Sequence, residues 1–168
     1  VIKNVIPKHM ESLSAKLTEM NVSVTEGEDW IRVKADKEIV KANIKTLPYP
    51  GFPTDLHPMT SVLLCLAKGT STVTEGVWDS RFQYVDELKR MGAKIKVEGR
   101  MAVIEGVQRL TGAPVKATDL RAGAAVVIAA LTAEGKSEVH NIHYIDRGYE
   151  RFEEKLKALG ADIVREDD

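Results

Sequence analysis

The chain has 168 residues, 43% of them apolar, so it is long enough to bury one substantial core. Its 24 Lys and Arg residues nearly balance 25 Asp and Glu, and a net charge of -1 favours neither nucleic acid nor an anionic membrane surface as a partner. A single cysteine, Cys65, excludes an internal disulfide and a multi-thiolate metal site. With no long apolar run and no signal peptide, the sequence predicts a cytoplasmic protein whose anion sites, if any, are local.

The strongest internal signal is a repeat with a period of about 70 residues. Residues 17–24, 88–95 and 156–163 align, and each segment reads as a helix that ends at Gly or Asn and continues directly as an alternating strand. Thr-Asp-Leu recurs at 54–56 and 118–120 and opens an almost wholly apolar run each time, which is typical of a buried helix. Each repeat therefore reads as strand, helix, strand, helix, strand, strand.

These patterns predict an α+β fold in which the apolar helices around residues 61–67 and 124–131 are enclosed by sheets. The helices that end at Met20, Met91 and Leu159 carry charge on one face and should be more exposed. We expect one domain, residues 1–168, holding about two and a half repeats. The first repeat lacks its Thr-Asp-Leu helix, and the chain starts without Met, which suggests removal from a longer protein; a degenerate first repeat is the alternative.

Three arginines share a position at predicted helix starts: Arg81, Arg121 and Arg147. Thr118 is the expected N-cap that places Arg121 at the third helical position. A cation there opposes the helix dipole unless an anion completes the site, and the guanidinium fork suits carboxylate and phosphate. Alternatively, each arginine forms a surface ion pair of little worth with the aspartate nearest in sequence, namely Asp79, Asp119 or Asp146.

Asp55 ends a turn-forming stretch, residues 49–55, that would hold its carboxylate at a helix start. It could simply stabilise the helix dipole, or it could accept a hydrogen bond or proton from a substrate hydroxyl. Composition alone favours the first reading. We expect Cys65 to be an inert packing residue and His57 to be exposed near the helix start.

Four segments together resemble the UDP-N-acetylglucosamine enolpyruvyl transferases: residues 49–55 (Tyr-Pro-Gly-Phe-Pro-Thr-Asp), 78–82 (Trp-Asp-Ser-Arg-Phe), 117–122 (Ala-Thr-Asp-Leu-Arg-Ala) and 144–151 (Tyr-Ile-Asp-Arg-Gly-Tyr-Glu-Arg). The resemblance covers essentially the whole chain. It implies transfer of enolpyruvyl from phosphoenolpyruvate to the 3-hydroxyl of UDP-N-acetylglucosamine, in the first committed step of peptidoglycan synthesis, without a cofactor. It also implies two similar domains, each an inside-out α/β prism of three βαβαββ units, with the active site between them.

By the same resemblance, Asp55 is the candidate general base and contacts the 3-hydroxyl of the sugar. Val77 would bind the sugar nucleotide through its backbone. The residues around phosphoenolpyruvate would be Arg81, Asp119, Arg121 and Arg147, with Arg121 and Arg147 also catalytic. The implied mechanism is addition of the hydroxyl to C2, which gives a tetrahedral ketal, followed by elimination of phosphate, with electrostatic stabilisation as the main contribution of the protein.

The family's near-N-terminal Lys-Asn pair and its loop with a reactive cysteine have no counterpart in this sequence. We therefore expect a C-terminal fragment that needs the missing N-terminal part as its partner and shows little turnover alone. Two alternatives stay open: the sister transferase that acts on shikimate 3-phosphate, and a non-catalytic binding or scaffold module.

Overall fold

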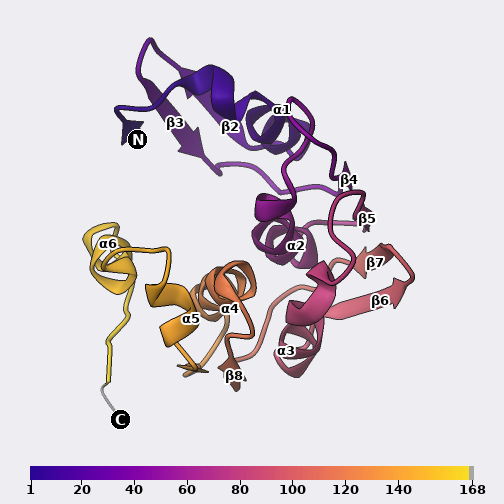
Figure 1. The fold of residues 1–168 in the computed structure, drawn as a ribbon, viewed down its shortest axis with the longest axis vertical. Coiled ribbons are helices and arrows are strands. Elements are labelled where there is room, and N and C mark those ends of the chain that lie inside the picture. The colour runs from indigo at the N-terminus through magenta and orange to yellow at the C-terminus, as the bar shows by residue number, and fades with distance from the viewer. Residues whose placement is uncertain (167–168) are drawn as a thin grey trace.

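The structure is a computed structural model that describes residues 1–166. A complete six-element unit occupies the middle of the chain (Figure 1). Its elements in chain order are β4 (Asn43–Lys45), α2 (His57–Cys65), β5 (Thr70–Thr74), α3 (Val85–Arg90), β6 (Lys94–Glu98) and β7 (Met101–Glu105). The strands form one sheet in the order β4-β5-β7-β6, in which β4 and β5 are parallel and the other neighbours antiparallel. The predicted order of elements is confirmed for this unit.

Smaller units flank it on both sides. The first contains β1 (Ile2–Lys3), α1 (Glu11–Glu19), β2 (Ser23–Glu26) and β3 (Trp30–Lys34), whose strands pair in the order β1-β3-β2. The last contains β8 (Pro114–Lys116), α4 (Leu120–Thr132), β9 (Glu138–His140), α5 (His143–Asp146) and α6 (Phe152–Ala158), with β8 parallel to β9. In Figure 1 these units form two arms that extend from the middle of the molecule to the same side.

The strand expected after Gly160 is not formed, and residues 161–166 have no regular structure. An isolated strand leaves its backbone groups unpaired, and none of the strands within residues 1–166 pairs with this segment. The helix that precedes it ends as predicted. Asn21, Gly92 and Gly160, which follow the three repeated helices, adopt the left-handed conformation with φ of 68°, 92° and 97°.

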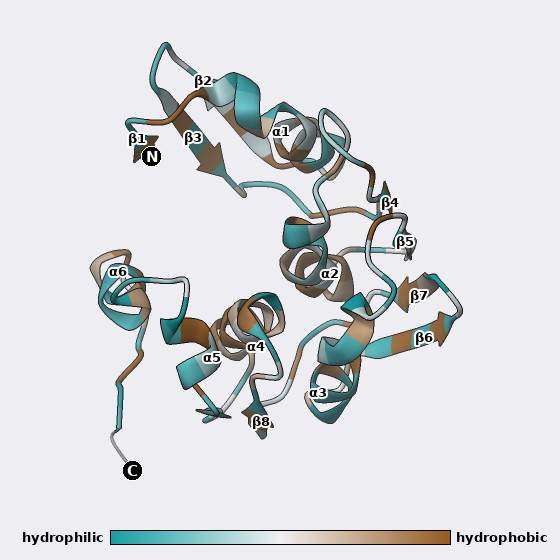
Figure 2. Cartoon of the chain, in the orientation of Figure 1, coloured by the Kyte–Doolittle hydropathy of each residue, from teal (hydrophilic) through white to brown (hydrophobic). Residues whose placement is uncertain are grey.

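The two apolar helices are buried, as predicted. Helices α2 and α4 pack against each other, and Figure 2 shows apolar residues along both. Leu64, Ala124 and Ala125 are fully buried. Small side chains let elements approach closely: a Cβ on Gly123 of α4 would lie 2.6 Å from the Ile145 side chain of α5.

Helices α1 and α6 contain no buried residue, which confirms the expected exposure for two of the three charged helices. The third, α3, is not as exposed as expected, because Val85, Glu87 and Leu88 are buried. Within the described residues, no helix is long and apolar enough to cross a membrane.

Cys65 lies at the end of α2 and is fully buried. Burial raises the pKa of its thiol to about 12, so almost none of it is thiolate at neutral pH. We expect native protein to react with Ellman's reagent about 100-fold more slowly than denaturant-unfolded protein, because the thiolate is the reacting species. Since no other cysteine contributes to the signal, equal rates in the two conditions would contradict the buried position.

Candidate active site

The starts of α2 and α4 are joined by an ion pair between residues 66 positions apart in sequence. Asp55 lies in the 3-10 turn Thr54–Leu56 that leads into α2, and Arg121 lies in the first turn of α4. Arg121 donates from Nε to Oδ1 of Asp55 at 2.7 Å and from Nη2 to Oδ2 at 3.1 Å. This fork-like contact raises the pKa of Arg121, and the packing of α2 against α4 brings its two partners together.

Arg81 approaches the same carboxylate from a third segment, the 3-10 turn Arg81–Tyr84 before α3. Its Nη2 lies 3.8 Å from Oδ1 of Asp55, and its Nε donates to the Thr54 hydroxyl at 3.1 Å. The guanidinium also lies over the ring of Trp78, 5.6 Å from the centroid. The structure thus places Asp55 between two of the three arginines that the sequence singled out, and we call Asp55, Arg81 and Arg121 the charged cluster.

None of the three arginines pairs with the aspartate next to it in sequence, so the prediction of local ion pairs is wrong. Asp79 pairs with Arg100, and Asp146 accepts two hydrogen bonds from Arg165, at 2.8 and 2.9 Å. Arg81 and Arg121 therefore face the carboxylate of Asp55, which lies far from both in sequence. Local spacing could not indicate this pairing.

Asp119 caps α4, in place of the predicted Thr118. Its Oδ1 accepts hydrogen bonds from the backbone N–H groups of Arg121 at 2.8 Å and Ala122 at 2.9 Å. Its extended backbone, with φ of -156° and ψ of 179°, is that of an N-cap, so Arg121 is the second helical residue and not the third. The buried Thr118 hydroxyl has no hydrogen-bond partner within residues 1–166.

We expect Asp119→Ala to lower the free energy of unfolding by about 1 kcal/mol, because two backbone N–H groups lose their acceptor. Thr118→Ala should change it by less than about 0.5 kcal/mol, since the hydroxyl makes no hydrogen bond that could be lost. Urea unfolding of both variants measures the difference. A larger loss for Thr118→Ala would show that the threonine caps the helix in solution.

Arg147 does not lie at a helix start, contrary to the prediction, because Asp146 ends α5 and Arg147 follows it. Its side chain is exposed and makes no hydrogen bond or ion pair with the residues that the structure describes. The adjacent Gly148 packs on Leu120, where a Cβ would lie 2.6 Å from Cδ2. This contact places the backbone beside Arg147 against Leu120, the first residue of α4, which directly precedes Arg121.

Glu75, which the sequence analysis did not single out, is the most densely hydrogen-bonded carboxylate near the cluster. It follows β5, is 1% exposed, and accepts from the backbone N–H groups of Val77 at 2.9 Å and Trp78 at 3.0 Å. Burial alone would raise the pKa of Glu75, but hydrogen bonds from Thr46, His57 and these two backbone groups lower it to about 2. A glutamate between a half-buried strand and a glycine was the sequence signal that could have revealed it.

Val77 and His57 are both held by Glu75. Val77 is 41% exposed, and since its N–H bonds Glu75, its carbonyl is the backbone group left for a ligand. His57 is fully buried, so its expected exposure is wrong: Nδ1 lies 2.7 Å from Oε2 of Glu75 and Nε2 lies 2.7 Å from the Tyr84 hydroxyl. Burial lowers the pKa of His57, which favours a neutral ring with its proton on Nδ1 facing the carboxylate.

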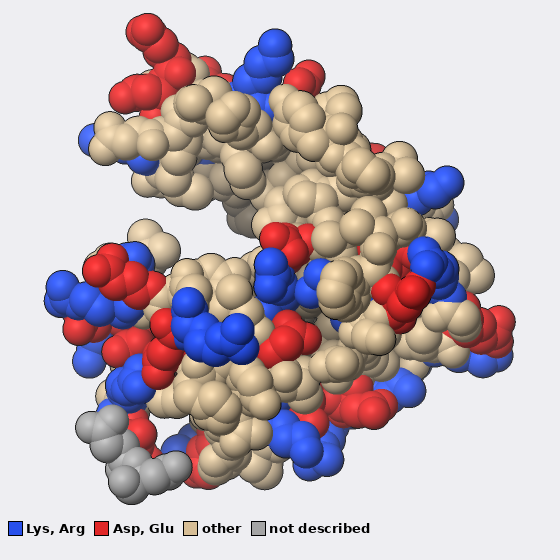
Figure 3. Space-filling view, viewed as in Figure 1, with Lys and Arg blue, Asp and Glu red and all other residues tan. Residues whose placement is uncertain are grey.

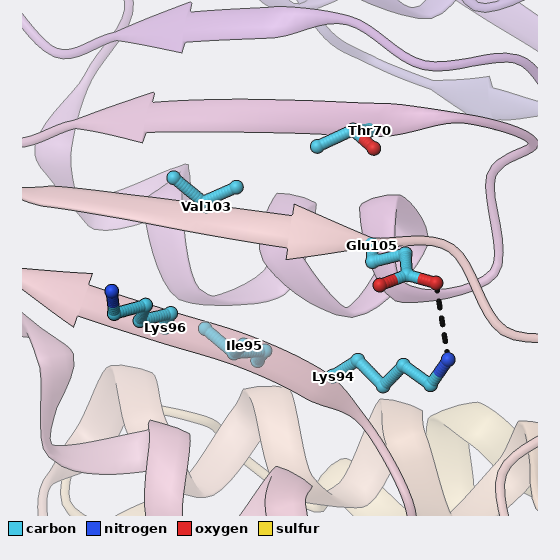
Figure 4. A pocket seen from close by; sticks show the side chains of 6 residues that line it. All are labelled: Thr70, Lys94, Ile95, Lys96, Val103 and Glu105. Atoms are coloured by element: carbon cyan, nitrogen blue, oxygen red, sulfur yellow. Dashed lines mark hydrogen bonds and ion pairs between the residues drawn. The ribbon is translucent and has the colours of Figure 1, made fainter.

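The space-filling view shows a hollow between the two arms, with acidic and basic side chains together at its inner end (Figure 3). A separate shallow depression of about 310 Å³ lies on the outer face of the four-stranded sheet (Figure 4). The residues that line it include the Lys94 and Glu105 pair, whose Nζ and Oε1 are 3.0 Å apart. No predicted site residue lines this depression, so we assign the candidate site to the charged cluster.

Residues 1–156 match the family model of EPSP synthase (3-phosphoshikimate 1-carboxyvinyltransferase). A UDP-N-acetylglucosamine 1-carboxyvinyltransferase of Desulfofundulus thermocisternus is 56% identical over 98% of this chain and 68% of its own length. The chain belongs to the UDP-N-acetylglucosamine 1-carboxyvinyltransferase family. UDP-N-acetylglucosamine 1-carboxyvinyltransferase 2 of Clostridium acetobutylicum is 61% identical over 98% of this chain, which spans 40% of that relative's length.

Solved structures agree with this family. The enolpyruvyl transferase NikO from Streptomyces tendae superposes with a TM-score of 0.83 at 29% identity, over 91% of this chain and 36% of its own. EPSP synthase from Acinetobacter baumannii gives 0.63 at 19% identity, over 93% of this chain and 37% of its own, which supports the fold alone. The resemblance read from the sequence and the predicted α+β fold class of the enolpyruvyl transferases are confirmed.

Proposed function

We propose that this chain supplies one side of the active site of a UDP-N-acetylglucosamine 1-carboxyvinyltransferase. The complete enzyme would transfer enolpyruvyl from phosphoenolpyruvate to the 3-hydroxyl of UDP-N-acetylglucosamine, in the cytoplasm, for peptidoglycan and cell-wall synthesis. The observation that carries this proposal is the charged cluster, in which one carboxylate faces two guanidinium groups from separate segments. A base and two anion-binding groups are the parts that this chemistry needs.

In the proposed site, Asp55 takes the proton of the 3-hydroxyl as the oxygen attacks C2 of phosphoenolpyruvate, while C3 takes up a proton from a general acid that the rest of the enzyme would supply. Loss of phosphate from C2 and of a proton from C3 then restores the double bond in the product. The carboxylate and phosphate of phosphoenolpyruvate compete with Asp55 for Arg121, and their arrival would free Asp55 to accept the proton. Arg81 and the exposed Arg147 would offset the remaining negative charge, and Asp119 would hold the start of α4 in place.

We further propose that residues 1–168 are most of one enolpyruvyl transferase domain and that the rest of the enzyme is the partner. One side of a cleft cannot surround the substrates and exclude water, so turnover by the chain alone should be very low. Phosphate release and intact mass, measured with both substrates, test this. The chain is assayed alone and mixed with the part of the Clostridium acetobutylicum relative that it does not match. It is also assayed as a chimera, in which the chain replaces the matching segment of that relative.

Phosphate release by the chimera together with a product heavier than UDP-N-acetylglucosamine by the enolpyruvyl group would support the proposal. A folded chimera that releases no phosphate would overturn it. Release with shikimate 3-phosphate in place of the sugar nucleotide would assign the chain to the sister reaction. A folded chimera that binds either substrate but does not turn it over would indicate that this chain is a binding module.

A further inference from the structure

The buried carboxylate of Glu75 is the point at which the segments of the candidate site are joined. Five groups contact it: the N–H groups of Val77 and Trp78, the hydroxyls of Thr46 and Thr54, and Nδ1 of His57. They come from the end of β4, the turn before α2, the start of α2 and the loop after β5. Since each segment is tied to the same two oxygens, their relative positions depend on this one side chain.

The direction of these hydrogen bonds is fixed by the neighbouring groups. The Thr46 hydroxyl accepts from the Gly76 N–H at 2.8 Å, and therefore gives its own proton to Oε1 of Glu75 at 2.6 Å. The Thr54 hydroxyl accepts from Nε of Arg81 at 3.1 Å and gives its proton to Oε2 at 3.0 Å. Glu75 thus acts only as a hydrogen-bond acceptor, and its negative charge is matched by the donors around it.

Two of these hydrogen bonds lead to different parts of the candidate site, one to Val77 and one to the charged cluster. On one side, Oε1 holds the N–H of Val77, whose carbonyl would contact the sugar nucleotide in the proposed site. On the other side, Oε2 holds Thr54, which in turn holds Arg81 and directly precedes Asp55. A single 1%-exposed side chain therefore lies between the sugar contact and the charged cluster.

We propose that Glu75 is a positioning residue, whose carboxylate sets the place of the Val77 carbonyl relative to Asp55 and Arg81. This inference rests on the proposed function, because it concerns the alignment of the two substrates that the site would hold. Since its side chain is 1% exposed, Glu75 would touch neither substrate. It acts through the loop after β5 and through Thr54, so its loss should misplace binding groups without removing any of them.

The substitution Glu75→Ala removes all five hydrogen bonds, whereas Glu75→Gln is expected to keep most of them. The Gln oxygen can accept from Val77, Trp78 and Thr46, while its amide group donates to Thr54 and to His57 in its other tautomer. Tyr84→Phe is the matched control. It removes the hydroxyl that lies 2.7 Å from both His57 and Ser61, so it weakens the same buried network from its far side.

Two measurements separate positioning from general destabilisation. The first is the amide ¹⁵N–¹H spectrum of this chain without ligand, in which Glu75→Ala should shift the Val77 and Trp78 resonances while Glu75→Gln and Tyr84→Phe leave them near wild type. The second is steady-state kinetics of the chimera. Glu75→Ala should raise KM for UDP-N-acetylglucosamine about 10- to 100-fold, Glu75→Gln should restore most of this, and Tyr84→Phe should stay within about twofold while lowering the melting temperature.

Unmoved Val77 and Trp78 amides in Glu75→Ala would overturn the inference whatever the activity. Equal kinetic losses in Glu75→Ala and Tyr84→Phe would also overturn it, since Glu75 would then act only on stability. A chimera that is folded but inactive with wild-type Glu75 would overturn the proposed function and, with it, the alignment of substrates. In that case, shifted amides would still establish Glu75 as the anchor of the loop after β5.

Discussion

Asp55→Asn in the chimeric enzyme is expected to reduce phosphate release by about 10²- to 10⁴-fold, the usual contribution of a positioned general base. Asparagine keeps the shape of aspartate but cannot take up the proton of the 3-hydroxyl. It also removes the charge that pairs with Arg121 and faces Arg81. Both guanidinium groups remain free for phosphoenolpyruvate, so kcat should fall while KM for phosphoenolpyruvate stays level or decreases.

The control for this substitution is Asp86→Asn, at an exposed aspartate in the first turn of α3. It removes the same charge and should leave kcat within about twofold of wild type, because surface substitutions away from special features have small effects. A raised KM for phosphoenolpyruvate with unchanged kcat in Asp55→Asn would contradict the role of base. It would instead assign Asp55 to holding Arg121 in place.

Local patterns predicted the parts of the fold that local chemistry decides. The apolar runs identified α2 and α4 as buried helices because a helix that is apolar on all sides has no face for water. The positions of Asn21, Gly92 and Gly160 were predicted because few residues tolerate positive φ. The strand after Gly160 was not formed because a strand also requires a neighbour, which an alternating sequence does not supply.

The candidate site was harder to predict because its contacts join distant segments. Spacing suggested that Arg121 would pair with Asp119, yet Asp119 caps α4 and Arg121 pairs with Asp55 in the preceding unit. His57 was expected to be exposed because its partner Glu75 lies 18 residues later, and local spacing does not connect the two side chains. Only the family resemblance connected Asp55 with the arginines. The roles of Asp55, Val77, Asp119 and the arginines in binding substrates stay predictions.

The packing of α2 against α4 links the core to the charged cluster, since each helix starts beside one partner of the Asp55 and Arg121 pair. Leu64 lies in α2 and is fully buried. We expect Leu64→Ala to lower the free energy of unfolding by about 2–5 kcal/mol, because it removes buried methyl groups and leaves a cavity that rigid neighbours fill only in part. The melting temperature of a chain of this size should fall by roughly 10 °C.

Leu159→Ala is the matched control, because the same atoms are removed from a side chain that is 82% exposed and follows the end of α6. Its effect on the free energy of unfolding should be below about 0.5 kcal/mol, measured by urea and thermal unfolding in parallel. Similar losses for both substitutions would mean that α2 is not tightly enclosed in solution. Because the starts of α2 and α4 hold Asp55 and Arg121, a loosely enclosed α2 would also fail to keep this pair at a fixed spacing.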